Sequence, residues 1–90
     1  MELEWDEGKR QKALRERQMD FADVARFDDA GLETIEDLRF DYGEHRFITY
    51  GFLDSRLCIY CWTSRGPRTR IISLRKANDR EKVRYGKYLD

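Results

Sequence analysis

The chain has 90 residues, of which 40% are charged and 40% hydrophobic, and its formal net charge is zero. This length predicts a single domain over residues 1–90, with a modest hydrophobic core. No apolar run is long enough to span a bilayer, and the acidic start Met-Glu-Leu-Glu differs from a signal peptide, so we expect a cytoplasmic protein.

The zero net charge hides an uneven distribution along the chain. Residues 1–45 hold 14 Asp/Glu and 7 Lys/Arg, a net charge of −7, whereas residues 46–90 hold 4 Asp/Glu and 11 Lys/Arg, a net charge of +7. Such asymmetry indicates either a polyanion bound by the basic half or a charged partner of the acidic half. Head-to-tail self-association would explain the same charges, and high salt should then separate the copies.

The N-terminal half predicts one strand and two helices. A short strand over Leu3–Trp5 is followed by Asp6, whose carboxylate can accept N–H bonds at the start of a helix over about Glu7–Arg17. Asp20 is a second N-cap, and the apolar residues after it recur every third position before Asp28. This pattern predicts a second helix between these two aspartates.

The C-terminal half predicts four more strands joined mostly by short turns, and then a last helix. The strands are expected over Leu32–Asp37 (an edge strand), Arg46–Leu53, Arg56–Ser64 and Arg68–Lys76. Asn78 and Glu81 form a capping-box start for the last helix. Its expected apolar face comprises Tyr85, Tyr88 and Leu89. Helices packed on an antiparallel meander define an α+β domain.

The strand over Arg68–Lys76 has an apolar centre and cations at both ends. Strict alternation sends one set of side chains to one face and the other set to the opposite face: Arg70, Ile72, Leu74 and Lys76 against Thr69, Ile71, Ser73 and Arg75. Two interpretations fit this pattern. The cations protect an edge strand from aggregation, or they bind a polyanion.

The pattern of cysteine and histidine predicts neither a metal site nor a cofactor. Cys58 and Cys61 have C-x-x-C spacing, but on a strand they point to opposite faces, roughly 10 Å apart, and no second pair completes a metal site. We expect them to be buried free thiols in a reducing compartment. His45 is the only histidine, which excludes a catalytic histidine pair, although it stays an outside candidate beside Glu44 and Arg46.

Several segments, in order along nearly the whole chain, resemble the BrnT-type toxins. These segments are Trp5-Asp6-Glu7-x-Lys9, Phe21-Ala22-Asp23-Val24 before Phe27-Asp28-Asp29, Asp41-Tyr42-Gly43-Glu44-x-Arg46-Phe47, Arg70-Ile71-Ile72-Ser73-x-Arg75-Lys76-Ala77, Arg80-Glu81 and Tyr85. The resemblance implies a RelE/ParE-like fold, an antiparallel sheet with two N-terminal helices and one C-terminal helix. It also implies a type II toxin that cleaves mRNA, arrests growth and is neutralised by a BrnA-like antitoxin.

The resemblance further implies how the toxin and its partner assemble. The antitoxin would carry a ribbon-helix-helix DNA-binding domain, and two toxins with two antitoxins would bind operator DNA through the antitoxin. One position departs from the family, which commonly has Lys-His-Gly between the first two helices. Here Glu16, Arg17 and Gln18 stand in their place, and an arginine supplies charge there but does not titrate near neutral pH.

The expected reaction is metal-independent RNA cleavage by attack of a ribose 2′-OH on the adjacent phosphorus. The residues expected to bind phosphate and stabilise transition-state charge are Arg46, Arg70, Arg75 and Lys76. Lys9 is a further cation or the general base, and Glu44 is the alternative base. The residues expected to bind RNA outside the reacting centre are Arg68, Arg80 and Arg84.

A non-catalytic binding module is the alternative function. The basic sheet would then dock an acidic antitoxin segment, nucleic acid or another cellular target. Related folds also host gyrase-directed toxins without nuclease activity, so fold analogy does not discriminate. A nuclease leaves defined cut ends on RNA without added metal, whereas a binding module only retards the RNA on a gel.

Overall fold

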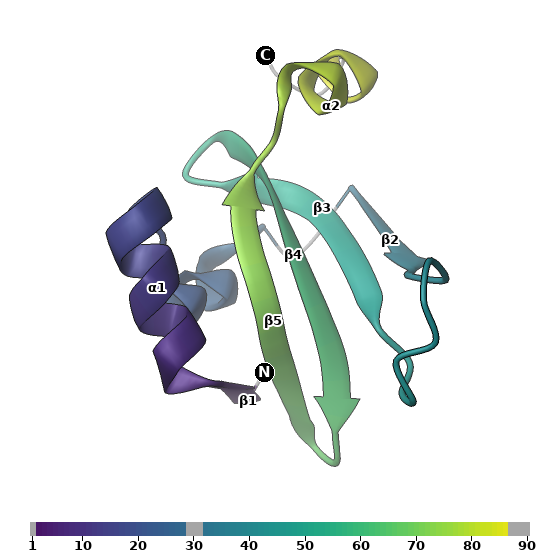
Figure 1. Cartoon of the computed structure of the whole chain (residues 1–90). Coiled ribbons are helices and arrows are strands. Elements are labelled where there is room, and N and C mark those ends of the chain that lie inside the picture. The colour runs from purple at the N-terminus through teal and green to yellow at the C-terminus, as the bar shows by residue number, and fades with distance from the viewer. Residues whose placement is uncertain (1, 29–31, 87–90) are drawn as a thin grey trace.

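The computed structural model describes residues 2–28 and 32–86, which form a five-stranded sheet, two α-helices and one 3-10 helix (Figure 1). The elements in chain order are β1 (Glu2–Trp5), α1 (Glu7–Arg17), η1 (Phe21–Arg26), β2 (Glu33–Glu36), β3 (Phe47–Leu53), β4 (Arg56–Arg65), β5 (Arg68–Lys76) and α2 (Asp79–Arg84). The order in the sheet is β1-β5-β4-β3-β2. Strands β2 to β5 form the predicted antiparallel meander, and β1 joins β5 in parallel. The predicted α+β class is therefore confirmed.

Local capping and turn residues explain where several elements begin and end. The carboxylate of Asp6 accepts the Lys9 N–H (2.9 Å) at the start of α1. Asp54 and Ser55 have φ values of 51° and 67°, the left-handed conformation that a tight two-residue hairpin requires. Asn78 and Glu81 form the predicted capping box at the start of α2. None of the described helices is long and apolar enough to cross a membrane.

The predicted second N-terminal α-helix is instead a 3-10 helix, η1. Phe21, Val24 and Phe27 recur every third residue, and a 3-10 helix has three residues per turn, so these side chains stack along one ridge. Its start is held by Asp20, which accepts the Ala22 N–H (2.9 Å) and two bonds from the Arg10 guanidinium of α1 (2.8 and 3.0 Å). The chain thus has one N-terminal α-helix, and the RelE-like assignment stays a prediction.

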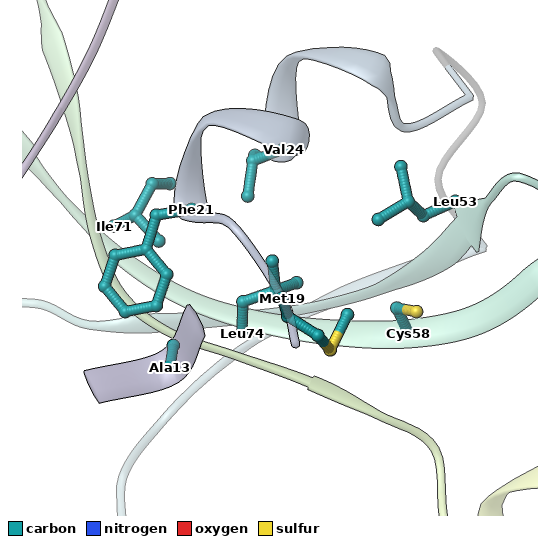
Figure 2. Packing of buried hydrophobic residues seen from close by; sticks show 8 residues of the cluster. All are labelled: Ala13, Met19, Phe21, Val24, Leu53, Cys58, Ile71 and Leu74. Atoms are coloured by element: carbon teal, nitrogen blue, oxygen red, sulfur yellow. The ribbon is translucent and has the colours of Figure 1, made fainter. Parts of the chain in front are cut away.

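One face of the sheet, called here the helical face, packs against α1 and η1 (Figure 1). The buried side chains that meet there are Ala13, Met19, Phe21, Val24, Leu53, Cys58, Ile71 and Leu74 (Figure 2). Apolar residues of both helices and of β3, β4 and β5 contribute to this cluster, so it is the contact that joins the helices to the sheet.

The opposite face, called the open face, is covered at one end by Ala77 and Tyr85, which flank α2. These two residues pack on Leu57 and Ile59 of β4. The Tyr85 hydroxyl donates to Glu33 of β2 (3.0 Å), and burial together with this hydrogen bond raises the pKa of Tyr85 to about 12. Tyr88 and Leu89, expected on the same apolar face of the last helix, lie outside the described residues.

A bulge in β5 overturns the strict alternation predicted for this strand. Trp62 pairs with Ile71 whereas Cys61 pairs with Ser73, so Ile72 is an extra residue without a partner on β4. The bulge reverses the faces of the residues that follow it. Arg70, Ser73 and Arg75 therefore share the open face, while Ile71, Leu74 and Lys76 share the helical face.

The two cysteines point to opposite faces of β4, as the strand assignment predicts. Both are free thiols. Cys58 is buried in the helical-face core, where burial raises the pKa of its thiol. Cys61 is only half-buried and lines the open face, which corrects the prediction that both are fully buried.

Candidate active site

Four cations and two carboxylates surround a cavity of about 170 Å³ at one edge of the sheet. Its lining residues are Asp6, Lys9, Glu44, Arg46, Arg65, Arg70, Ile71 and Ile72, and we call it the Lys9 cavity. Four of the six residues predicted to be catalytic lie here: Lys9, Glu44, Arg46 and Arg70. They come from segments that are far apart in sequence and that meet only in the folded chain.

Lys9 reaches this cavity because of the parallel pairing between β1 and β5. Glu4 pairs with Arg70 and Trp5 with Ile71, so α1 begins beside the middle of β5. The Asp6 cap then fixes the first helical turn, which carries Lys9. The same pairing places Glu4 against Arg70, whose guanidinium donates to the Glu4 carboxylate (2.7 Å). Arg70 is thereby held in one orientation, with 28% of its side chain exposed.

Glu44 joins two arginines at the rim of the cavity. Its carboxylate accepts hydrogen bonds from Arg46 (3.1 Å) and Arg65 (3.2 Å). The hydrogen bond from Arg46 and the positive charge of Arg65 lower the pKa of Glu44. Glu44 is consequently ionised at neutral pH, and it is a weaker proton acceptor than an unpaired glutamate.

A buried carboxylate supports the loop that carries Glu44 and Arg46. Asp37 accepts two bonds from the Arg39 guanidinium (both 2.8 Å) and one from the Tyr42 hydroxyl (2.9 Å), and the Arg39 hydrogen bonds lower its pKa well below the usual range. The ring of Tyr42 in turn lies 4.1 Å from the Arg46 guanidinium. This cation–π contact fixes the guanidinium of Arg46, which also lines the cavity.

Two further cavities follow the Lys9 cavity along β5. The Lys9 cavity shares Lys9 and Ile72 with a second cavity of about 240 Å³, and that cavity shares Arg17 and Ser73 with a third of about 550 Å³ on the open face. We call these three neighbouring cavities together the β5 groove, because β5 residues line each of them. Its far end is floored by side chains of the sheet, including Ile48, Tyr50, Ile59 and Cys61.

Arg75 lies at the far end of the β5 groove rather than in the Lys9 cavity. Its guanidinium donates two hydrogen bonds to Glu81 of α2 (2.8 and 2.9 Å), and this interaction raises the pKa of Arg75. The arginine is therefore already paired with a carboxylate, and 40% of its side chain remains exposed.

Lys76 lies on the helical face, apart from the other predicted catalytic residues. It lines two cavities beside the β3–β4 hairpin, with Arg56 in both. Six residues of extended chain separate it from Arg70, a span of about 20 Å. One small cavity cannot contain both side chains.

The three residues predicted to bind RNA divide between the two ends of β5. Arg68 begins β5, near the Lys9 cavity, and lies 3.7 Å from Glu2. Arg80 and Arg84 lie on α2, where Arg84 donates to Glu33 (3.3 Å). His45 is 81% exposed at its side chain, and its contact with Glu36 (2.6 Å) raises the pKa of the imidazole.

Lys12, Arg17 and Tyr42 are site residues that were not predicted from the sequence. Lys9, Lys12 and Arg17 recur at spacings of three and five along α1, and all three line the second cavity. Arg17 also donates to the Leu74 carbonyl (3.1 Å), which fixes it beside the edge of β5. The spacing of these cations along α1 could have identified Lys12 and Arg17 from the sequence. Tyr42 belongs to one of the segments that resemble the family, but its contact with Arg46 depends on the loop conformation.

No group of three or more His, Cys, Asp or Glu side chains with the arrangement of a metal site is present within residues 2–28 and 32–86. The cations that line the Lys9 cavity are lysine and arginine side chains. Such a site can bind a phosphodiester and stabilise the extra negative charge of a phosphorane.

Comparison with protein families identifies the family of this chain. Residues 5–81 match the family model described as "Ribonuclease toxin, BrnT, of type II toxin-antitoxin system". This chain belongs to the BrnT family of ribonuclease toxins. No curated protein matches the chain. Every residue of the Lys9 cavity lies within the matched region, and membership of a type II toxin–antitoxin family implies an antitoxin partner for this BrnT chain.

Proposed function

We propose that this BrnT chain is a metal-independent endoribonuclease that cleaves mRNA in the Lys9 cavity and thereby arrests growth. The observation that carries the proposal is that Lys9, Arg46, Arg65 and Arg70 line one cavity together with the carboxylate of Glu44, which Arg46 and Arg65 contact. The cations can hold a phosphodiester, and the carboxylate is a proton acceptor within the same cavity. The description of the family as ribonuclease toxins supports the reaction class.

The proposed reaction is an intramolecular transesterification of RNA. The 2′-oxygen attacks the adjacent phosphorus and loses its proton, and the bond from phosphorus to the 5′-oxygen breaks. The products are a 2′,3′-cyclic phosphate and a 5′-hydroxyl, which takes up one proton. Arg70 and Arg46 stabilise the charge that develops on the phosphoryl oxygens, since preorganised cations act most strongly where charge appears.

Glu44 and Lys9 are the two candidates for accepting the 2′-OH proton. Glu44 is ionised, but its lowered pKa weakens it as a base. Lys9 lies in the same cavity and would have to be uncharged to accept a proton. We assign the role of proton acceptor to Glu44, because its carboxylate can accept a proton without first losing one. We assign to Lys9 the stabilisation of the negative charge that develops on the phosphoryl oxygens.

The β5 groove provides a path for the RNA on either side of the cut. Arg17 and Lys12 lie between the Lys9 cavity and the open face, where they can pair with flanking phosphates. Tyr50 lines the far end and offers an aromatic ring to a base. Arg75 would bind phosphate there only after exchanging its partner Glu81. Arg68, Arg80 and Arg84 would extend the basic surface at the two ends.

We assign the antitoxin partner to the BrnA-like class. In this proposal the antitoxin carries a ribbon-helix-helix domain, and two toxins assemble with two antitoxins on operator DNA. Its sequence-specific contacts would come from the antitoxin alone. Mass measurement of the purified complex, with and without an operator duplex, tests both the stoichiometry and the route of DNA binding.

Incubation of the purified chain with total RNA in excess EDTA is the direct test of the activity. We expect discrete fragments with 2′,3′-cyclic phosphate ends, and no fragments from the Arg70→Ala variant prepared in parallel. Retardation of intact RNA by a folded, antitoxin-free chain would instead support the non-catalytic binding module. Cleavage that appears only after magnesium is added would contradict metal independence.

The ring of Tyr42 is expected to contribute more to the rate of RNA cleavage than its hydroxyl does. Tyr42→Leu removes the ring stacked on Arg46 and should lower kcat for RNA cleavage about tenfold, as expected for a cation–π contact of moderate strength. Tyr42→Phe keeps the ring, loses only the bond to Asp37 and should stay within about threefold of the parent. Equal losses in both variants would show that the hydroxyl, not the stacking, sets the position of Arg46.

A further inference from the structure

Exposed large apolar side chains of the described chain concentrate beside β2. Ile35, Leu38 and Phe40 are 42%, 80% and 69% exposed, and the one other such residue, Val83, lies on α2. Ile35 and Leu38 also line the far end of the β5 groove. An exposed apolar patch of this kind on a small protein marks a contact surface.

The same patch borders an unpaired strand edge. Among the described residues, β2 is the last strand of the sheet and pairs only with β3. The Asp37 N–H donates to the Arg46 carbonyl (2.8 Å), so Asp37 and Arg46 are a hydrogen-bonded pair of the ladder between this segment and β3. Alternation along the antiparallel ladder then turns the N–H and C=O groups of Thr34 and Glu36 away from β3. Neither proline nor lysine protects this edge.

The negative charge around β2 indicates which kind of strand can pair with its free edge. Residues 32–45 contain five Asp/Glu and one Arg. A second copy of β2 paired antiparallel about Ile35 would place the outward groups of Thr34 opposite those of Glu36 and would set Glu33 opposite Asp37 at both ends. Like charges directly opposite each other destabilise a sheet. A strand with cations opposite Glu33 and Glu36 would be attracted instead.

We infer that an extended segment of the antitoxin adds to the free edge of β2 as a sixth strand. The residue of this segment opposite Glu36 is a Lys or Arg, and the next one, opposite Ile35, is apolar. The residue opposite Thr34 can be of any type, and the one opposite Glu33 is a second Lys or Arg. The apolar residue packs on Ile35 and extends toward Leu38. The inference uses the family's antitoxin partner and does not depend on the proposed nuclease chemistry.

Thr34→Pro tests this pairing directly. Proline removes the outward N–H without removing a bond to β3, and edge strands tolerate it at such positions. Thr34→Val is the matched control, because it loses the hydroxyl contact with Thr49 (2.9 Å) but keeps the N–H. Both changes are made in an Arg70→Ala chain, and the probe is the full-length antitoxin of the same pair, titrated by calorimetry.

We expect Thr34→Pro to weaken antitoxin binding by at least about tenfold relative to Thr34→Val. Amide hydrogen exchange on the chain with native Thr34 should show new protection at Thr34 and Glu36 in the complex, which supports the inference even if the proline variant fails to fold. Equal affinities of the two folded variants, or protection confined to other strands, would overturn it. Protection of β2 that rises with toxin concentration in the absence of antitoxin would assign the edge to a second copy.

Discussion

Arg70→Ala is expected to lower the rate of RNA cleavage by about 10²–10³-fold, the cost of removing one preorganised donor from a transition state. Arg70 lines the Lys9 cavity and is held by Glu4 across the β1–β5 pair, so its charge is already in place when the phosphorane forms. The loss should appear in kcat, with a smaller change in KM. Single-turnover cleavage of a short RNA, with the folded state checked by circular dichroism, measures the effect.

Two control variants separate chemistry from structure in this experiment. Glu4→Gln removes the ion pair but leaves the Arg70 guanidinium, and we expect it to retain activity within about tenfold of the parent. Lys76→Ala changes a cation on the other face of β5, and we expect it to remain within about threefold. A larger loss from Lys76→Ala than from Arg70→Ala would move the reacting centre out of the Lys9 cavity. Continued growth arrest on expression of Arg70→Ala would reject the assignment of Arg70 to the reacting centre.

Leu74→Ala is expected to lower the free energy of unfolding by about 2–5 kcal/mol. The Leu74 side chain is fully buried in the helical-face core, where it is surrounded by residues of α1, η1 and β4. Truncation leaves a cavity that these elements cannot fill without moving. Since domains of this kind are stable by only about 5–15 kcal/mol, the variant should unfold at a clearly lower urea concentration.

Leu38→Ala is the matched control, because the same atoms are removed from a side chain that is 80% exposed. We expect its free energy of unfolding to stay within about 0.5 kcal/mol of the parent. Both leucine variants should be compared in the same background by equilibrium urea unfolding. A small effect of Leu74→Ala would mean that the contact between helices and sheet is not what stabilises the domain.

Local features of the fold were predictable because neighbouring residues determine them. Asp6 and Asn78 begin helices through their own side-chain hydrogen bonds, and Asp54-Ser55 forms a tight turn between two apolar runs. The same logic identified most of the strands. The second helix was wrong in type, since apolar residues every three positions also suit a 3-10 helix, and over six residues the sequence alone does not separate the two.

The residue types of the candidate site were predictable from the sequence, but only some of the residues that line it were predicted. Lys9, Glu44, Arg46 and Arg70 were all selected from the basic pattern and the family resemblance, and the folded chain brings them to one cavity. The contribution of α1 to that cavity depends on the parallel pairing of β1 with β5, a contact between residues more than sixty positions apart. No local pattern encodes such a pairing.

The sequence by itself determined the strands, the two α-helices, the uneven distribution of charge along the chain and the residue types of the site. The tertiary structure decided which cations act together. The extra residue Ile72 reverses the faces of β5, so Arg75 joins Arg70 on the open face while Lys76 moves to the other. The physical reason is that side-chain direction in a strand has a period of two, and one unpaired residue changes the face of every residue after it.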